Sequence, residues 1–431
     1  MSDFVFKFKY QVHSQLSFPS SYGWCVEIRT RIKLTYQVDS DLPEEPVYRL
    51  KNGLPFTPKR GEFPPFQGCY DEEYMPGQKN KIPTYRVDLD LPPDERWKQL
   101  VLEKQEDIVN LLANMKNHTD LIFGVSVFRL VNRYMPLLTK TLPKPYYEEL
   151  VGIAQYSNCT IGEITLFNLF YEFFSVCTSI VMEGEDGQMY HGRNLDFGLF
   201  LGWDPKNQTW LTTEYLRPLV VNVDFVKNKE VLFSTTTFAG YLGILTALKR
   251  NKFSLTINER FKLNGGYIGL TEWILGRRNH RWMGLLTRQV MEEADSFKAA
   301  QKMLIEPDLI APVYFILAGT KGNQGTIITR GRSDSNILDI GSNRTRNFQS
   351  WFLVQTNYDN WLNPPFYDDR MGPAVTCLNK WGQKNPKNTL FNVLSTRPVL
   401  NKLTVYTTIM NPAQGTFESQ IQDCKSPCWP W

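Results

Sequence analysis

The sequence predicts a layered α/β fold in which strands are enclosed by helices. Residues before Cys177 repeat apolar side chains at helical spacing in four windows, 95–115, 121–137, 146–156 and 161–174. Residues after Cys177 form short β-branched or aromatic runs bounded by Gly or Asn, at 219–225, 231–237, 253–258, 314–318, 326–329 and 352–356. Further helical patterns lie between these strands, at 273–275 and 282–294. Such elements pack as an α/β sandwich, although periodicity does not fix the number of layers.

The first 65 residues precede these patterns, and the sequence assigns them no role. They contain short β-like runs such as 24–36 and a Pro-rich stretch at 53–66. Residues 1–10 alternate apolar and charged side chains, so this N-terminus does not resemble a signal peptide.

The helical part begins near Asp94, whose carboxylate we expect to cap the helix 95–115. The apolar stretch 164–182 contains Asn168 and Glu172. These polar residues favour a packed helix that runs into a buried strand over a membrane span. We therefore expect no transmembrane segment.

The strand-rich half of the chain opens with a hairpin. A β-branched run follows Cys177, a Glu-Asp-Gly turn lies at 185–187, and a second run carries Arg193 and Asp196. If Cys177 begins the first strand, Arg193 and Asp196 arrive close to its sulfur. The pattern thus predicts a thiol, a guanidinium and a carboxylate in one corner.

The thiol of Cys177 needs a base or a positive neighbour to become a nucleophilic thiolate. We expect Arg193 to lower its pKa from the reference value of ~8.5. The chain has only four histidines, and a papain-like triad with His191 and Asn357 lacks the sequence signature around the cysteine. An alternative base is the α-amino group of Cys177, freed by cleavage after Val176. On residues alone, a buried small hydrophobe is the commoner state of such a cysteine.

Composition excludes several classes of protein. The 431 residues carry a net charge of +4 with 21% charged residues, and no Lys/Arg run indicates nucleic acid. No phosphate-binding glycine loop, G-x-S-x-G or H-E-x-x-H motif occurs, so nucleotide enzymes, serine hydrolases and zinc hydrolases lack support. We expect no cofactor and no metal.

Cysteines and sequons indicate a secretory route. The odd count of seven cysteines permits three bridges and one free thiol, as in a secreted or lysosomal thiol enzyme. Four asparagines lie in glycosylation sequons, which also arise by chance: Asn117, Asn158, Asn207 and Asn343.

Four separated motifs carry a resemblance to a known family. They are CTSIVMEGEDGQMYHGRNLDFGLFLGW from Cys177, LTINERFKLNGGYIGLTEWILG from Leu255, VQTNYDNW from Val354 and YDDRMGPA from Tyr367. Together they resemble the acid ceramidases, in the choloylglycine-hydrolase branch of the N-terminal-nucleophile hydrolases, a branch that includes N-acylethanolamine acid amidase. The likeness runs from about Cys69 to the C-terminus.

The resemblance implies a four-layer αββα sandwich with additional N-terminal helices. Residues 66–176 would form an α-subunit-like helical segment and 177–431 a β-subunit-like catalytic segment, interwoven in one domain after an extension at 1–65. Cleavage between Val176 and Cys177 would convert one precursor into a heterodimer with Cys177 as the new N-terminal nucleophile.

The resemblance also implies roles for the charged residues around this nucleophile. Asp196 would hold the new α-ammonium, and its alternative is a turn aspartate. Glu259 would assist maturation; taken alone, it reads as a solvated turn residue. Asn357 would donate to a developing oxyanion, where its alternative is an Asn that ends a strand. Arg370 would buttress the pocket, whereas without the resemblance it reads as a surface ion pair.

Two disulfides are implied by the family pattern, Cys69–Cys377 across the two segments and Cys424–Cys428 around a small loop. A metal site at the second pair is the alternative, although no further Cys or His pair completes it. Cys25 and Cys159 remain unassigned.

The apolar stretch 199–203 directly follows the strand of Arg193 and Asp196. Beside a nucleophile it could line an acyl-chain channel or touch a membrane, and core packing is the equally weighted alternative.

The predicted function is hydrolysis of ceramide to a sphingoid base and a fatty acid by a self-processing lysosomal amidase. Alternatives are hydrolysis of N-acylethanolamines by the same chemistry, and an uncleaved lipid-binding protein with a silent thiol. For partners, the resemblance implies a lipid surface with saposin-type activators and anionic lipids.

Overall fold

The computed structural model describes residues 66–75, 81–123, 127–170, 175–197, 202–204, 206–261, 266–342, 350–425 and 428. They fall in one compact unit, Val47–Trp431. The expected strand at 24–36, most of the Pro-rich stretch 53–66, Cys25 and Asn343 lie outside the described residues. The division at residue 65 stays a prediction.

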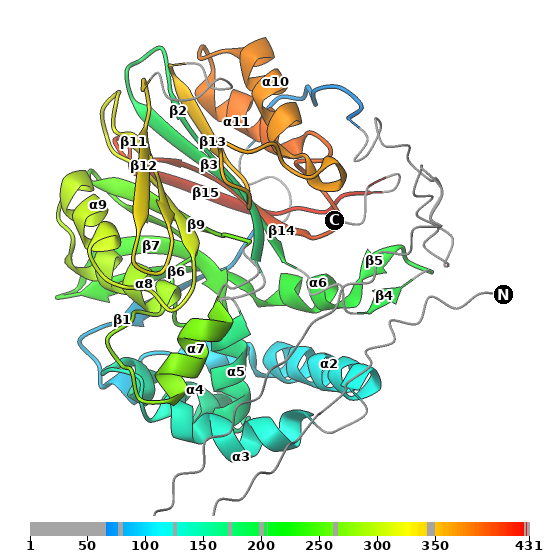
Figure 1. Ribbon diagram of the computed structural model, residues 1–431, viewed down its shortest axis with the longest axis vertical. Helices are drawn as coiled ribbons and strands as arrows, with labels where there is room; N and C mark the ends of the chain where they lie inside the picture. The colour runs from blue at the N-terminus through cyan, green and yellow to red at the C-terminus, as the bar shows by residue number, and fades with distance from the viewer. Residues whose placement is uncertain are drawn as a thin grey trace, which may run out of the picture. The chain divides into compact units, whose positions relative to one another are not determined.

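Two large sheets form the centre of the described structure (Figure 1). The smaller sheet has the strand order β13 (Phe352–Gln355), β2 (Ser175–Glu183), β3 (Met189–Phe197), β14 (Thr404–Asn411) and β15 (Thr416–Ile421). The larger sheet has the order β1 (Thr84–Asp88), β6 (Val220–Lys227), β7 (Glu230–Phe238), β8 (Thr246–Lys249), β9 (Phe253–Glu259), β10 (Val313–Ala318), β11 (Gly325–Arg330) and β12 (Ser335–Asp339). A separate ribbon pairs β4 (Trp203–Asp204) with β5 (Thr209–Trp210).

Helices cover the outer faces of both sheets, which confirms the four-layer α/β sandwich. On the smaller sheet, α10 (Met371–Trp381) lies against β13, and α11 (Pro386–Ser395) lies against β2, β3 and β14. On the larger sheet, α8 (Met283–Glu293) contacts β7, and α9 (Phe297–Ile305) contacts β10 and β11. The remaining helices are α1 (Lys98–Glu103), α2 (Gln105–Phe123), α3 (Val127–Thr139), α4 (Tyr146–Ser157), α5 (Ile161–Phe170), α6 (Leu211–Leu216) and α7 (Gly266–Ile274).

The two sheets pack face to face through apolar side chains. Val181 of β2, Tyr314 and Ile316 of β10 and Leu353 of β13 share one buried cluster. The predicted hairpin is confirmed, because β2 pairs antiparallel with β3 and the register places Cys177 opposite Leu195. All nine residues of β3 are buried, so its polar side chains must find partners inside the protein.

The predicted boundaries of the helix 95–115 are wrong. Asp94 lies in a short 3-10 helix, Pro93–Glu95, and caps nothing. The chain then forms two helices, α1 and α2, because Lys104 leaves helical geometry at φ −106° and ψ 11°. The side chain of Lys104 instead reaches the carbonyl of Pro218 at 2.7 Å and Asp107 at 3.1 Å.

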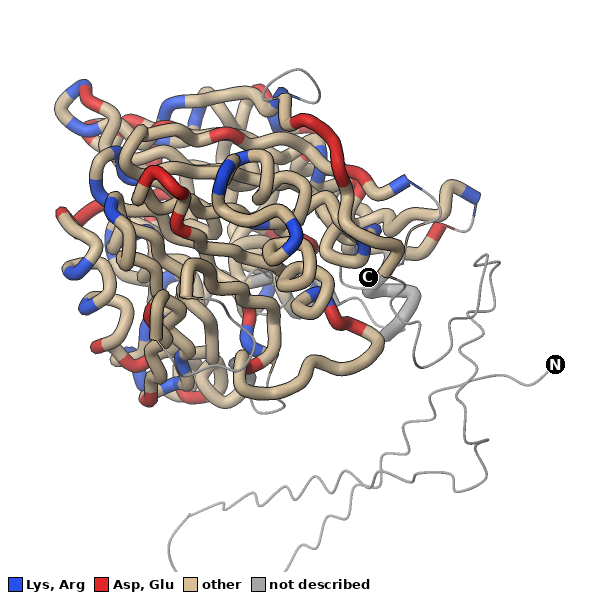
Figure 2. Tube along the Cα trace, turned by 90° about the horizontal axis from the view of Figure 1, so that it is seen from above, with Lys and Arg blue, Asp and Glu red and all other residues tan. Residues whose placement is uncertain are grey.

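The apolar stretch 164–182 is divided between α5 and β2, as predicted for a helix that runs into a buried strand. Among the helices of the described residues, none is long and apolar enough to cross a membrane. Figure 2 shows basic and acidic residues interspersed along the described chain, in accord with its small net charge.

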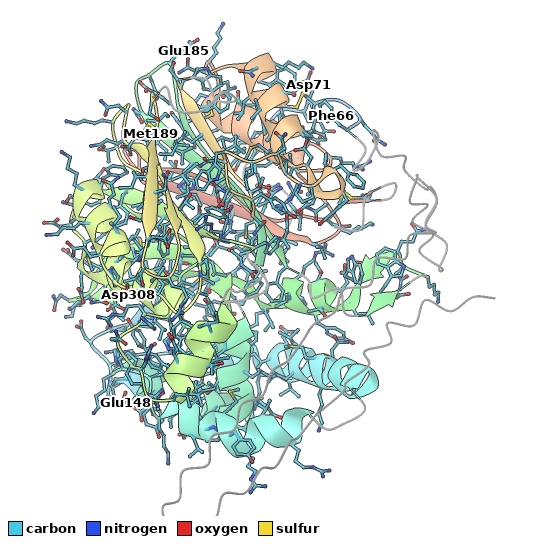
Figure 3. All side chains as sticks on the ribbon, viewed as in Figure 1. Phe66, Asp71, Glu148, Glu185, Met189 and Asp308 are labelled. Atoms are coloured by element: carbon cyan, nitrogen blue, oxygen red, sulfur yellow. A yellow bond between two sulfur atoms is a disulfide. The ribbon has the colours of Figure 1, made fainter. Side chains whose placement is uncertain are left out.

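Both implied disulfides are present, Cys69–Cys377 and Cys424–Cys428. The first joins the segment 66–75 to α10, where Figure 3 labels Phe66 and Asp71. The second disulfide excludes a metal site at Cys424 and Cys428, because both sulfur atoms are used in the bridge. Cys159 and Cys177 are free thiols, so the described residues hold two bridges.

Candidate active site

The thiol of Cys177 lies between the two sheets beside the guanidinium of Arg193. Arg193 Nη2 is 2.6 Å from Cys177 Sγ. Its Nη1 donates to the carbonyl of Leu245 at 3.0 Å and to the Thr246 hydroxyl at 2.7 Å. The guanidinium also lies 5.9 Å from the ring centre of Tyr406. The predicted proximity of Arg193 to the sulfur is therefore observed, whereas the side chain of Asp196 points to the opposite face of the sheet. Partners in the larger sheet and directly before β8 hold the guanidinium in place.

Arg193 lowers the pKa of Cys177 as expected, but the net pKa of this thiol in the intact chain is raised. Burial raises the pKa of this fully buried thiol, and the charge of Arg193 opposes the rise without reversing it. The reason is desolvation, which penalises a thiolate between two sheets more than one cation stabilises it. Water must reach the sulfur, or a base must lie beside it, before the thiolate forms.

The side-chain amide of Asn357 binds the backbone of two residues, Cys177 and Glu259. Its Oδ1 accepts from the backbone N–H of Cys177 at 2.8 Å and from Arg370 Nη2 at 2.8 Å. Its Nδ2 donates to the carbonyl of Glu259 at 2.8 Å. Two donors and one acceptor fix which way the amide points. In this state Nδ2 faces Glu259, so donation to an oxyanion stays a prediction.

Arg370, directly before α10, buttresses the other side of Cys177. Its Nη1 donates to the carbonyl of Cys177 at 2.6 Å. Asp368 accepts from Nε at 2.8 Å and from Nη2 at 3.0 Å, so the carboxylate orients the planar guanidinium. Arg370 is fully buried, which excludes the alternative of a surface ion pair.

Asp196 lies on the face of the smaller sheet opposite the sulfur. Val176, not Cys177, is its register partner, and successive side chains of a strand point to opposite faces. Its carboxylate accepts from Thr404 Oγ1 at 2.6 Å and from Asn401 Nδ2 at 3.0 Å. Burial raises its pKa to about 6, opposed by Arg370. Its role toward an α-ammonium stays a prediction.

Glu259 ends β9, beside the site. Its backbone carbonyl is bound by Asn357, as described above. The role of its carboxylate in maturation stays a prediction.

His191 is engaged by hydroxyls and forms no papain-like triad. Its Nδ1 lies 2.9 Å from Ser254 Oγ and its Nε2 lies 2.9 Å from Thr256 Oγ1. Burial lowers its pKa to about 3, with a smaller contribution from the charge of Arg193. The ring is therefore a neutral, fully buried member of the interface between the sheets.

Sequence reasoning missed Asn258, which joins three strands at the site. Its Oδ1 accepts from Ser179 Oγ of β2 at 2.8 Å. Its Nδ2 donates to the carbonyls of Gln355 and Thr356, at 2.8 and 3.2 Å, immediately before Asn357. A signal existed in the sequence, because Ser254, Thr256 and Asn258 alternate with apolar residues along β9.

The residue before the nucleophile packs in a small apolar cluster. Val176 shares this cluster with Trp210 and Leu403, and Trp203 packs against it. The part of the stretch 199–203 that is described thus lies against the predicted cleavage position. Residues 199–201 lie outside the described residues.

Three of the four sequon asparagines lie in the described part, and all three are exposed: Asn117, Asn158 and Asn207. Asn158 adopts a left-handed conformation after α4, and Asn207 Nδ2 donates to Asp204 at 2.7 Å.

Two sheets between helix layers, with a thiol near the start of a buried strand of the smaller sheet, define the fold class of the N-terminal-nucleophile hydrolases. Residues 177–373 match the model for linear amide C–N hydrolases of the choloylglycine hydrolase family. The chain is 45% identical over 377 residues to acid ceramidase of Homo sapiens, which covers 85% of this chain and 94% of that protein. Acid ceramidase of Mus musculus is 43% identical over 379 residues, covering 86% and 95%. The chain therefore belongs to the acid ceramidase family.

A related family is also similar to this chain. Residues 80–142 match the model for the beta subunit of N-acylethanolamine-hydrolyzing acid amidase. A solved structure of the Caenorhabditis elegans ortholog of that amidase is 34% identical, with a TM-score of 0.47, and covers 57% of this chain and 100% of that chain.

Proposed function

We propose that this protein hydrolyses the N-acyl amide bond of ceramide, with Cys177 as the nucleophile. Membership of the acid ceramidase family carries the proposal. The environment of Cys177 supports it, because Arg193 contacts the sulfur while Asn357 and Arg370 bind the backbone of the same residue. Contacts that fix the position of a nucleophile favour covalent amide hydrolysis.

The proposed maturation is an acyl shift followed by hydrolysis. Cys177 Sγ attacks the carbonyl carbon of Val176, the bond from that carbon to the nitrogen of Cys177 breaks, and the thiol proton passes to the departing amine. Water then cleaves the thioester and returns the thiol, leaving a carboxylate on Val176. Arg370 and Asn357 would keep the strand in place during this step, since they bind the carbonyl and the N–H of Cys177.

The proposed turnover repeats this chemistry on the substrate. The freed α-amine accepts the thiol proton, the sulfur attacks the amide carbonyl, and the proton moves to the departing sphingoid amine. Water then releases the fatty acid. In this scheme Asp196 binds the α-ammonium, Glu259 assists maturation, and Asn357 turns its donor toward the oxyanion.

We further propose that the protein works in the lysosome as a glycosylated heterodimer. The exposed sequon asparagines and the disulfide across the two segments support this route. The lipid surface that presents the substrate would include anionic lipids, with a saposin-type activator as a partner.

The test is a Cys177→Ala variant. We expect the wild type to yield two chains on a reducing gel, one of them beginning at Cys177, and to release fatty acid from ceramide. The variant should remain a single chain without activity. A Cys177→Ala variant that is still cleaved contradicts the proposal. A wild type that stays uncleaved and inactive also contradicts it, and would indicate the lipid-binding alternative.

A second candidate substrate is an N-acylethanolamine. The match of residues 80–142 to the amidase model favours it. Parallel assays of fatty-acid release from ceramide and from an acylethanolamine distinguish the two, because the chemistry on Cys177 is the same.

A further inference from the structure

A buried ion pair joins the two chain segments that carry Glu259 and Asn357. Arg260 directly follows Glu259, and Asp359 lies two residues after Asn357. Arg260 Nε donates to Asp359 Oδ1 at 2.6 Å and its Nη2 donates to Oδ2 at 2.9 Å. The two side chains are 5% and 12% exposed. A two-point contact of this kind fixes orientation as well as distance.

Other contacts hold the ion pair itself in place. The Tyr314 hydroxyl of β10 donates to Asp359 Oδ1 at 2.7 Å. Arg260 Nη1 donates to the carbonyl of Arg330, on β11, at 3.2 Å. The pair therefore ties the loop after β13, in the smaller sheet, to three strands of the larger sheet.

The segment that carries Asn357 lies beyond strand pairing and is held by side-chain contacts, among them Asn258 to the carbonyls of Gln355 and Thr356 and Gln355 to the carbonyl of Tyr358. The ladder of β13 ends at Gln355. The backbone of Asn357 is joined to the segment after β9 by the Phe261 N–H, which donates to its carbonyl at 3.3 Å. The side chain of Asn357 must nevertheless meet the Cys177 N–H and the Glu259 carbonyl at the same time.

We propose that Arg260 and Asp359 are positioning residues that hold the amide of Asn357 against the backbone of Cys177. Neither side chain touches the reacting atoms; each acts through the segment that it ties down. Displacement of a reacting group by about 1 Å costs on the order of 100-fold in rate. The activity arm of the test rests on the proposed function, and the exchange arm does not.

The exchange arm measures hydrogen exchange of the backbone amide at position 177 in the Cys177→Ala background. That N–H donates to Asn357 Oδ1, so its protection reports the position of the amide. Asp359→Asn and Arg260→Gln should each speed exchange at position 177 at least about tenfold. The matched control is Arg96→Gln, which breaks a comparably enclosed pair with Glu149, 2.9 Å long, on the helical segment. It should leave exchange at position 177 unchanged.

The activity arm measures kcat, KM and the rate of self-cleavage in the same variants with Cys177 restored. We expect kcat and self-cleavage to fall about 10- to 100-fold, with KM within about threefold. The double variant should be no worse than the poorer single variant, because the pair acts as a unit. Arg260→Lys keeps the positive charge but loses the two-point contact with Asp359, so its kcat should lie between those of the wild type and Arg260→Gln.

Wild-type protection at position 177 in folded Asp359→Asn protein overturns the proposal. A loss of protection of equal size in Arg96→Gln also overturns the proposal, because exchange at position 177 would then report only a general loss of stability. If the wild type does not hydrolyse ceramide, the proposed function fails, and the exchange arm still decides the role of Arg260 and Asp359.

Discussion

Replacing Asp196 by Asn should change how stability depends on pH. The carboxylate is fully buried, and burial raises its pKa from 3.8 to about 6. Between these values the folded protein binds a proton that the unfolded chain has released. Stability therefore falls as the pH rises through this window, and acid favours the folded state.

The size of the effect follows from the difference of about two pKa units, which corresponds to about 3 kcal/mol. The wild type should gain up to this amount relative to Asp196→Asn when the pH is lowered from 7.5 to 4. His191 titrates in the opposite sense, because burial lowers its pKa to about 3. It is present in both proteins, so its contribution cancels in the comparison.

The assay is urea unfolding of both proteins in the Cys177→Ala background, at several pH values and constant ionic strength. The control is Asp339→Asn, which removes an exposed carboxylate from β12. A free-energy difference between wild type and Asp196→Asn that is the same at pH 4 and pH 7.5 would refute the reasoning. It would mean that Arg370, together with Thr404 and Asn401, stabilises the carboxylate enough to offset its desolvation.

Two further predictions concern the sulfur atoms. Arg193→Gln removes the cation that opposes burial at the Cys177 thiol. We expect kcat/KM to fall on the order of 100-fold, with the pH profile displaced upward; an unchanged profile would exclude this role. Cys377→Ser opens the bridge to Cys69, which closes a sequence separation of 308 residues. We expect a loss of about 2–5 kcal/mol in unfolding free energy, and processed chains that separate on non-reducing gels; chains that stay together would show another covalent link.

Local sequence was sufficient to predict the hairpin and the pairing of Cys177 with Arg193. The β-branched run, the turn at 185–187 and the second run set the register, and register brings Arg193 to the sulfur. Side chains alternate between the two faces of a strand, so Asp196 must point to the face opposite that of Arg193 and Cys177. Its orientation could therefore have been predicted from the sequence. Strand β14 escaped prediction although all eight of its residues are buried and Asn411, Pro412 and Gly415 supply a turn signal after it.

The motifs of the family, also a property of the sequence, pointed to the disulfides and to the residues that converge on the nucleophile. The structure brings Asn357 and Arg370 to Cys177 across 180 and 193 positions of the chain. No local pattern carries such distances.

Only the tertiary structure decided the electrostatics and the orientation of these groups. Whether Cys177 ionises to a thiolate depends on how much water the larger sheet excludes from its sulfur. Burial raises the pKa of this thiol more than the charge of Arg193 lowers it. Which end of the Asn357 amide faces Cys177 depends on donors and acceptors supplied by other strands. Desolvation and hydrogen-bond direction arise from many distant atoms at once, so residue types determined which groups are present and packing determined what each can do.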